Sequence, residues 1–389
     1  MFDLARARRE TPSCTDKVFL DSAGSSLPST GVLETVIAHL RREAEVGGYV
    51  AHDERAADLA AVKESIGTLV RCGASNIALS DSATRSWNDF FQAVPLHEGD
   101  RILISEVEYA SNAIATLQRA GRVGAEVDVI PSDPYGQIDL SALETMLDER
   151  VRLVSLVHVP TNGGLVNPVR EAADMAHRVG ALVLLDACQS VGQIDIDMPA
   201  LGVDALSATG RKWLRGPRGT GFLALRPGPD EVVQPRALDL HGGEWVAPTE
   251  FEMAADASRF EFWECDVAAR LGLGAAVEHL LELGTDTVQR EISERAGYLR
   301  GELSSVRGVT VRDLGEQQCG IVTFTVDGRD SRDVRKALAE RNVTVTASGR
   351  SSTLLDMTGR DLESVVRASP HYFVSYEDLD TAITHIRSL

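Results

Sequence analysis

The segment ALVLLDACQSVGQIDIDMPALGVDALSATGRKWLRGPRGTG, residues 181–221, decides the fold of this chain. Its apolar beginning predicts a buried strand that ends on Asp186. Lys212 follows about 26 residues later, between Gly210 and a Gly-Pro-Arg-Gly loop. A carboxylate at the carboxyl end of a buried strand can hold a positive charge in a dry crevice, and a nearby lysine can form an imine with a carbonyl. The segment therefore places two complementary groups in one unit of the fold.

Pyridoxal phosphate is a cofactor that needs both groups. Its pyridinium nitrogen requires an acidic partner and its aldehyde requires a lysine. Neither residue decides the matter alone, because aspartates often cap helices and an isolated lysine is usually a solvated surface charge. The small residues around Lys212 leave room for a planar ligand. We therefore expect Asp186 and Lys212 to be catalytic.

Three stretches carry a resemblance to a known family: residues 185–190 (LDACQS), 207–221 and 366–380. They resemble the class V aminotransferase family of fold-type I pyridoxal-phosphate enzymes, and the likeness spans nearly the whole chain. Within that family the chain is most similar to isopenicillin N epimerase-like proteins and to hercynylcysteine sulfoxide C–S lyases, the latter through residues 43–50 (EAEVGGYV). The resemblance implies pyridoxal 5′-phosphate as cofactor and a homodimer as the assembly.

The succession of strand and helix patterns predicts an α/β fold with a mostly parallel sheet that is covered on both faces. By resemblance, residues 18–270 form the large domain of a fold-type I enzyme, with a sheet of the seven-stranded type. Residues 1–17 and 271–389 are expected to form a smaller α/β domain. Its strand signals lie at residues 309–311, 320–326 and 343–346.

Composition and charge limit the possible partners. A chain of 389 residues that is 43% hydrophobic can bury a large core. Its formal net charge of -19 argues against nucleic acid or an anionic membrane as partner. The first residues lack the apolar core of a secretory signal and no run approaches the length of a membrane span, so we expect a cytoplasmic protein. Five scattered cysteines predict neither a disulfide framework nor a metal site.

A phosphate seat is predicted where a strand at residues 77–80 meets the next helix. Small and hydroxylated residues there expose backbone N–H groups at the positive end of the helix dipole, although Ser and Thr also cap helices without any ligand. The resemblance implies that Ala83 and Thr84 bind the phosphate. It adds Thr209 and Arg211 as further ligands, the arginine bringing a fixed positive charge where desulfurases have a histidine.

Other positions are expected around the cofactor ring. The resemblance puts Tyr109 where desulfurases carry a stacking histidine. A tyrosine can stack on the ring but cannot shuttle protons at neutral pH as histidine does. The same match puts Gln189 at the 3′-oxygen and Thr161 near the ring oxygen or the substrate. His158 is expected to be a buried structural residue.

Substrate contacts are expected from three parts of the chain. Arg367, at the start of an apparent strand, matches the arginine that binds the substrate α-carboxylate bidentately in the family. Ala23 and Gly24 lie in a turn that approaches the same carboxylate in relatives. Tyr49 follows a helix-breaking pair of glycines and is expected to face the active site, with an ordinary surface tyrosine as the alternative.

One absence bears on the reaction. Cysteine desulfurases carry a nucleophilic cysteine in the loop before the carboxylate-binding arginine, whereas residues 348–354 here read SGRSSTL. Cys319 is the last cysteine of the chain and directly precedes a strand pattern. Persulfide-forming desulfuration is therefore not expected. Glu264 stands where desulfurases carry a threonine that reaches the phosphate of the neighbouring subunit, and neither it nor Arg85 receives a role.

The predicted reaction is a β-elimination. Lys212 would remove the α-proton, Asp186 would keep the ring nitrogen protonated, and Arg367 would hold the carboxylate. An S-substituted cysteine or its sulfoxide would yield a thiol or sulfenic acid, pyruvate and ammonia, in sulfur-metabolite or antibiotic biosynthesis. The same residues also serve transamination, epimerisation and decarboxylation. Outside catalysis, the alternative is a relative kept as a binding subunit.

Overall fold

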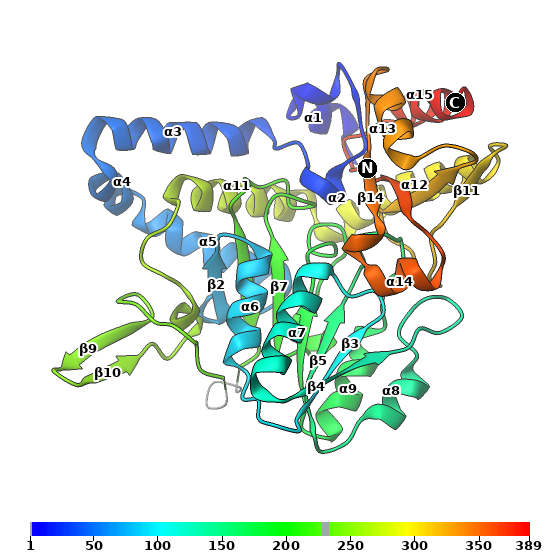
Figure 1. Cartoon of the computed structure of the whole chain (residues 1–389). Helices are drawn as coiled ribbons and strands as arrows, with labels where there is room; N and C mark the ends of the chain where they lie inside the picture. The colour runs from blue at the N-terminus through cyan, green and yellow to red at the C-terminus, as the bar shows by residue number, and fades with distance from the viewer. Residues whose placement is uncertain (1, 228–232) are drawn as a thin grey trace.

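The computed structural model describes residues 2–227 and 233–389 and has a seven-stranded sheet at its centre (Figure 1). The sheet order is β2-β8-β7-β6-β5-β3-β4. Strand β8 runs antiparallel to both of its neighbours, and the other pairs are parallel, which confirms the predicted mostly parallel sheet. The strands are β2 (Ile77–Ser80), β3 (Arg101–Ser105), β4 (Glu126–Ile130), β5 (Val151–Val157), β6 (Leu182–Asp186), β7 (Ala205–Thr209) and β8 (Gly221–Leu225).

Successive residues of these strands enter two different cores. On β6, Val183 and Leu185 belong to the core that contains the alanines of α9, whereas Leu184 belongs to the core that contains Trp87 of α6. Strands that are buried on both faces read as continuous apolar runs, which is why the sequence shows no alternation there. The sheet is thus covered on both faces, as predicted.

The helices begin at local signals in the sequence. Ser29, Ser82, Asp139, Asp266 and Ser375 each accept a hydrogen bond from the first turn of the helix that follows. The helices are α1 (Leu4–Arg9), α2 (Ser22–Ser25), α3 (Thr30–Val46), α4 (Gly48–Glu54), α5 (Ala56–Val70), α6 (Ala83–Ala93), α7 (Ala110–Val123), α8 (Leu140–Met146), α9 (Val169–Arg178), α10 (Met198–Leu201), α11 (Val267–Leu283), α12 (Thr285–Ser304), α13 (Ser331–Ala339), α14 (Leu354–Gly359) and α15 (Tyr376–Arg387).

The C-terminal part of the chain forms a second, antiparallel sheet in the order β11-β12-β15-β14. Its strands are β11 (Val309–Val311), β12 (Val322–Val326), β14 (Thr346–Gly349) and β15 (Ser364–Ala368). The single strand predicted over 343–346 is wrong. Val345 separates β13 (Val343–Thr344), which pairs with β1 (Val18–Phe19), from β14, which pairs with β15. The domain boundary predicted near residue 270 falls inside α11 and stays a prediction.

A hairpin of β9 (Gly243–Ala247) and β10 (Glu250–Met253) projects from the body of the molecule (Figure 1). Trp245 and Phe251 on this hairpin are 79% and 63% exposed. A two-stranded hairpin alone is at best marginally stable in water. The hairpin therefore leaves two large aromatic side chains open to solvent in the single chain.

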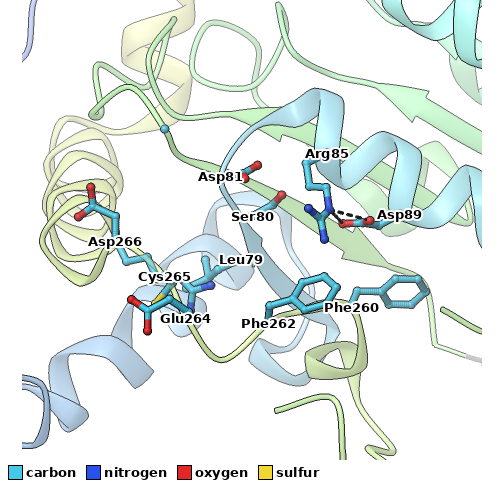
Figure 2. A pocket seen from close by; sticks show the side chains of 12 residues that line it. Leu79, Ser80, Asp81, Arg85, Asp89, Phe260, Phe262, Glu264, Cys265 and Asp266 are labelled. Carbon is cyan, nitrogen blue, oxygen red and sulfur yellow. Dashed lines mark hydrogen bonds and ion pairs between the residues drawn. The ribbon is translucent and has the colours of Figure 1, made fainter. Parts of the chain in front are cut away.

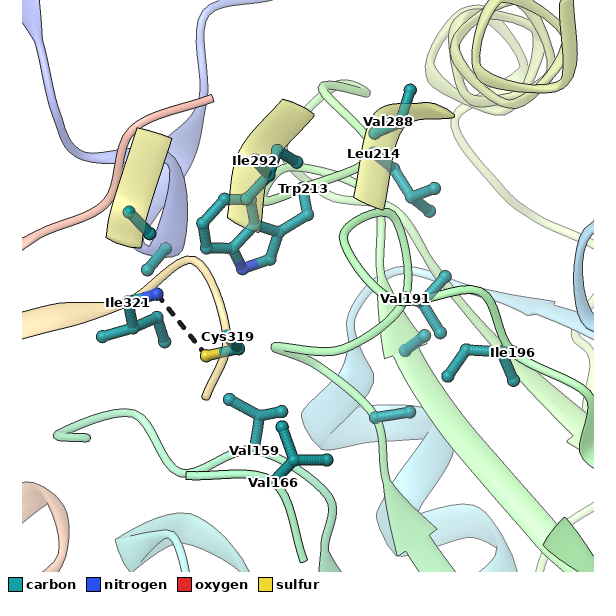
Figure 3. Close-up of a cluster of buried hydrophobic side chains, with 14 of the residues drawn as sticks. Val159, Val166, Val191, Ile196, Trp213, Leu214, Val288, Ile292, Cys319 and Ile321 are labelled. Atoms are coloured by element: carbon teal, nitrogen blue, oxygen red, sulfur yellow. Dashed lines mark hydrogen bonds between the residues drawn. The ribbon is translucent and has the colours of Figure 1, made fainter. Parts of the chain in front are cut away.

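The loop after β7 is held in place by a buried apolar cluster (Figure 3). Trp213 is fully buried, and Figure 3 places Ile292 of α12 close to its ring. Cys319 and Ile321, which precede β12, belong to the same core. The residue next to Lys212 is thus packed where the central sheet meets the C-terminal part of the chain.

The structure also bears on metals and membranes. Within residues 2–227 and 233–389, no helix is both long and apolar enough to cross a bilayer. Over the same residues, no group of three or more His, Cys, Asp and Glu side chains is placed to hold a metal ion. The five cysteines are free thiols.

Candidate active site

A pocket lies at the carboxyl ends of β5, β6 and β7. The ends of parallel strands are where α/β proteins place their ligands, because the loops that follow converge there. Many residues that the sequence singled out meet in this pocket. It is lined by Ser82, Ala83, Thr84, Tyr109, Val157, Val159, Thr161, Asp186, Cys188, Gln189, Arg211 and Lys212.

Asp186 ends β6 and is 8% exposed. Its carboxylate accepts hydrogen bonds from Asn112 Nδ2 (2.9 Å) and from the backbone N–H of Cys188 (2.9 Å). These two donors hold the carboxylate in one orientation. An anion fixed at a strand end in this way can accept a further bond from a cationic ring nitrogen.

Lys212 lies in the same pocket, on the loop between β7 and β8. Burial lowers the pKa of its amine, and the positive charges of Arg211 and Arg367 lower it further. A larger share of this amine is therefore neutral, and nucleophilic, at neutral pH than for a lysine in water. Among the four lysines of the chain, Lys17, Lys63, Lys212 and Lys336, it is the one that lines this pocket.

The predicted phosphate seat forms at the start of α6. Ser82 caps this helix, and the side chain of Ser207 on β7 donates to Ala83 O (2.9 Å). Gly221 allows this close approach, because a Cβ there would lie 2.8 Å from Ala208 O and 2.9 Å from Ala83 N. The helix N-terminus thus reaches the pocket directly beside β8.

The other residues expected at the phosphate are close by. Thr84 lines the pocket at the start of α6. Arg211 lines it as well, and its guanidinium donates to Thr209 Oγ1 (3.0 Å). A helix N-terminus, a threonine hydroxyl and a guanidinium form a donor set suited to a phosphate dianion.

Gln189 connects the pocket to three other segments. Its Nε2 donates to Ala23 O (3.0 Å) and to Thr161 Oγ1 (3.3 Å), while its Oε1 accepts from Trp213 Nε1 (3.0 Å). The amide is therefore bonded at both ends, although the residue lines the pocket. Its contact with the 3′-oxygen of a cofactor stays a prediction.

Arg367 is 5% exposed and lies near the end of β15, not at the start as predicted. Its Nη1 donates to Thr161 Oγ1 (2.8 Å), and its Nη2 lies 3.4 Å from Asp21 Oδ1. Its Nε has no hydrogen-bond partner among the described residues. A buried guanidinium with a free N–H can still donate a hydrogen bond to a carboxylate.

The turn of Ala23 and Gly24 forms α2 and lies beside these groups. Ala23 accepts from Gln189 and its N–H donates to Ser369 Oγ (2.9 Å). Gly24 leaves space for Asp21, since a Cβ there would lie 2.5 Å from Asp21 Oδ1. The turn thus lies behind the pocket, on the side of Arg367.

Tyr49 does not line this pocket within one chain, and its contact with the substrate stays a prediction. Gly47 has φ of 89°, which ends α3 and starts α4 in a new direction. The 17 residues of α3 separate Tyr49 from α2 by about 25 Å of helix. The Tyr49 side chain is 73% exposed, and α4, which carries it, lies at the end of α3 remote from α2 (Figure 1).

Arg85 and Glu264, which the sequence left without a role, line a second pocket that shares no lining residue with the first (Figure 2). Arg85 pairs with Asp89 (2.9 Å), and its guanidinium lies 4.6 Å from the centre of the Phe262 ring. Arg85 therefore turns away from the phosphate seat. Glu264 is drawn beside Cys265 and Asp266 at the opposite end of this second pocket.

Sequence reasoning missed some residues of the site. Asn112 and Glu108 are buried beside Asp186, and Cys188 lines the pocket. The family resemblance gives roles at the cofactor to their neighbours Tyr109 and Gln189. No sequence pattern indicates that Glu108, Asn112 and Cys188 also lie at or beside the pocket. His158 is buried as expected, and burial lowers its pKa to about 4, so its ring is neutral.

Comparison with known proteins places this geometry in a family. The family model for class V aminotransferases matches residues 18–381. The chain belongs to this family. Its cofactor is pyridoxal phosphate, and the donor set described above fits that group: Lys212 for the aldehyde, Asp186 for the ring nitrogen, and the start of α6 with Arg211 for the phosphate.

Individual relatives of this class V enzyme cover almost its whole length. A protein of Methanothermobacter thermautotrophicus named a probable cysteine desulfurase is 27% identical over 96% of this chain and 94% of its own. One of Mycobacterium tuberculosis named a probable hercynylcysteine sulfoxide lyase is 29% identical over 93% and 87%. The crystal structure of an Escherichia coli cysteine desulfurase has the same fold, with a TM-score of 0.91 at 22% identity over 99% and 98% of the two chains.

The lowered pKa of Lys212 predicts where the cofactor attaches. After incubation with pyridoxal phosphate at neutral pH and reduction with borohydride, the label is expected on Lys212, because burial lowers the pKa of its amine and so favours the neutral, nucleophilic form. Mass spectrometry of the peptides measures the site. A Lys212→Arg variant serves as the control and should lose the label. Equal labelling of Lys17 or Lys336 in the wild type would contradict the assignment.

Proposed function

We propose that this class V enzyme is a pyridoxal-phosphate-dependent C–S lyase that cleaves an S-substituted cysteine, or its sulfoxide, by β-elimination. The observation that carries the proposal is a pocket that is lined by Lys212 and Asp186 and in which burial raises the pKa of the lining thiol, Cys188. The products would be a thiol or a sulfenic acid, pyruvate and ammonia. The relative named a hercynylcysteine sulfoxide lyase supports a sulfoxide among the substrates to be tested.

The thiols near the site argue against a persulfide route. The loop between β14 and α14, where desulfurases carry their cysteine, holds Ser351 and Ser352. Cys188 lines the pocket, but burial raises the pKa of its thiol far above the usual range, and the charge of Asp186 raises it further. Burial also raises the pKa of Cys319 to about 12. Both thiols are protonated at neutral pH, and a thiol is a far weaker nucleophile than a thiolate.

Each residue of the site has a distinct proposed role in the reaction. Bound pyridoxal phosphate supplies an electron sink for the charge left at the α-carbon. Lys212 takes the α-proton on Nζ, since its lowered pKa makes the neutral amine available. Asp186 would hold the proton at the ring nitrogen. Arg367 would orient the substrate carboxylate, and Tyr109, which is 38% exposed at the start of α7, would contact the face of the ring.

Product analysis tests this proposal. Purified enzyme is expected to release pyruvate from at least one member of a panel of S-substituted cysteines and their sulfoxides, without any added keto acid. Pyruvate is measured by coupled reduction and the thiol by a chromogenic disulfide. A Lys212→Ala variant should release neither. Cofactor spectral changes without pyruvate would contradict the lyase and favour transamination, epimerisation or decarboxylation.

Replacing Arg367 separates substrate binding from chemistry. Arg367→Ala is expected to raise KM by roughly 30- to 150-fold, because charge-assisted hydrogen bonds to a carboxylate are worth about 2–3 kcal/mol. The turnover number should change less, since the carboxylate is bound in both ground and transition states. Steady-state kinetics measures both.

Arg312→Ala is a matched control. This half-buried arginine bonds Thr325 on the neighbouring strand β12 and does not line the pocket. The KM of the Arg312→Ala variant should stay at the wild-type value. An unchanged KM in Arg367→Ala would remove the carboxylate role from Arg367.

We further propose that the enzyme is a homodimer that buries the exposed aromatic residues around α4 and the β9–β10 hairpin. Tyr49, Trp245 and Phe251 are each more than 60% exposed. Trp263, which is 45% exposed, contacts His52 of α4 with ring centroids 6.3 Å apart. An apolar surface of this kind on a folded chain favours association with a partner.

Sedimentation measures the assembly. The wild type should have about twice the 41.9 kDa mass of one chain. Tyr49→Glu should shift the population toward the monomer, because a charge in a buried interface is unfavourable. Tyr135→Glu is the control, at a 51% exposed position remote from α4. This variant should leave the population of the dimer unchanged. A monomeric wild type would contradict the proposal.

A further inference from the structure

Glu108 is a buried carboxylate for which the reaction described above has no use. It directly follows the turn of residues 106–107 at the end of β3, and it is 3% exposed. Within the described residues it forms no ion pair, and burial raises its pKa to about 7, helped by the nearby charge of Asp186. Burying a carboxylate without a cation is costly, so such a residue is usually kept for a local task.

Three hydrogen bonds hold Glu108 in place. Oε1 accepts from the backbone N–H of Tyr109 (2.9 Å) and from Asn112 Nδ2 (3.0 Å). Oε2 accepts from the hydroxyl of Ser155 on β5 (2.8 Å). The carboxylate is thereby fixed between the central sheet and the first turn of α7.

Asn112 joins Glu108 to Asp186. Its amide nitrogen donates to Glu108 Oε1 and to Asp186 Oδ2 (2.9 Å), so both N–H bonds are used and the orientation of the amide is set. Asn112 is 2% exposed, so its amide cannot exchange these hydrogen bonds for bonds to water. The position of Asp186 Oδ2 therefore depends on where Glu108 holds Asn112.

We propose that Glu108 is a positioning residue of the active site, which fixes Asp186 through Asn112 and fixes Tyr109 through its backbone N–H. The inference rests on the roles proposed for Asp186 and Tyr109 at the nitrogen edge and the face of the cofactor ring. One buried carboxylate would then align two cofactor contacts that come from different strands. The link is made by hydrogen-bond geometry, so a neutral acceptor of the same shape can replace the carboxylate.

Cofactor affinity and the visible circular dichroism of bound pyridoxal phosphate test this role. Glu108→Ala is expected to raise the dissociation constant of the cofactor by about tenfold or more, the size of effect seen when residues that orient a ligating group are removed. The dichroic band should change shape or intensity, because the ring is held less firmly. Glu108→Gln should restore both values to near wild type, since its amide oxygen can accept from Tyr109 and Asn112.

Asp204 provides a matched control at the opposite end of the same sheet. It is a fully buried carboxylate that accepts from the N–H of Val183 (2.7 Å) and pairs with His177 (2.9 Å). Asp204→Ala should lower the melting temperature but leave cofactor affinity and dichroism unchanged. If Glu108→Ala fails to fold, Asn112→Ala cuts the link to Asp186 without touching the carboxylate and should give the same loss of affinity.

Each outcome decides the proposal. Wild-type affinity and dichroism in Glu108→Ala or Asn112→Ala would overturn it, as would a Glu108→Gln variant that fails as badly as alanine. An equal loss of affinity in Asp204→Ala would reduce the effect to general destabilisation and overturn it too. These measurements use no substrate, so a failure of the lyase assay leaves the positioning role standing, and the reverse also holds.

Discussion

The active site depends on a chain of hydrogen bonds that crosses two loops of the central sheet and reaches the C-terminal sheet. Trp213 donates to Gln189, Gln189 donates to Thr161, and Arg367 of β15 donates to the same threonine. Trp213 directly follows Lys212 in the sequence. This series of hydrogen bonds therefore sets the distance between Lys212 and Arg367, the arginine proposed to bind the carboxylate. All of its side chains are buried or half-buried, where an unmade hydrogen bond is expensive.

The site also reverses the charge of the molecule around it. The chain carries a formal net charge of -19, yet Arg211, Lys212 and Arg367 gather at the pocket. Salt screens exposed charges over about 10 Å, whereas buried charges are screened much less. The local cations therefore govern what binds there, and anionic groups such as a phosphate and a carboxylate are suited to it. The net negative charge of the whole chain bears on solubility, not on what binds in the pocket.

Much of the fold could be predicted because its signals are local. An apolar run followed by Asp186 indicated a buried strand with a polar end, and the strand at 77–80 has the predicted bounds. The predictions that failed depend on distant partners. Val345 divides one expected strand because β1 and β15 lie on different sides of it. Tyr49 stays a prediction: within one chain it lies beyond Gly47, at the end of α3 remote from α2, and whether it meets a pocket depends on the assembly.

The sequence by itself determined the cofactor chemistry, since a lysine and an aspartate in a strand-and-loop unit carry that information in their residue types and order. Only the tertiary structure decided which other side chains share the pocket. Cys188, which lines it, is one of five scattered cysteines, and Glu108 and Asn112, which are buried beside Asp186, have no distinguishing pattern. They matter because parallel strands distant in sequence end at one edge of the sheet, which brings Ser155 of β5 and Asp186 of β6 within reach of the turn after β3.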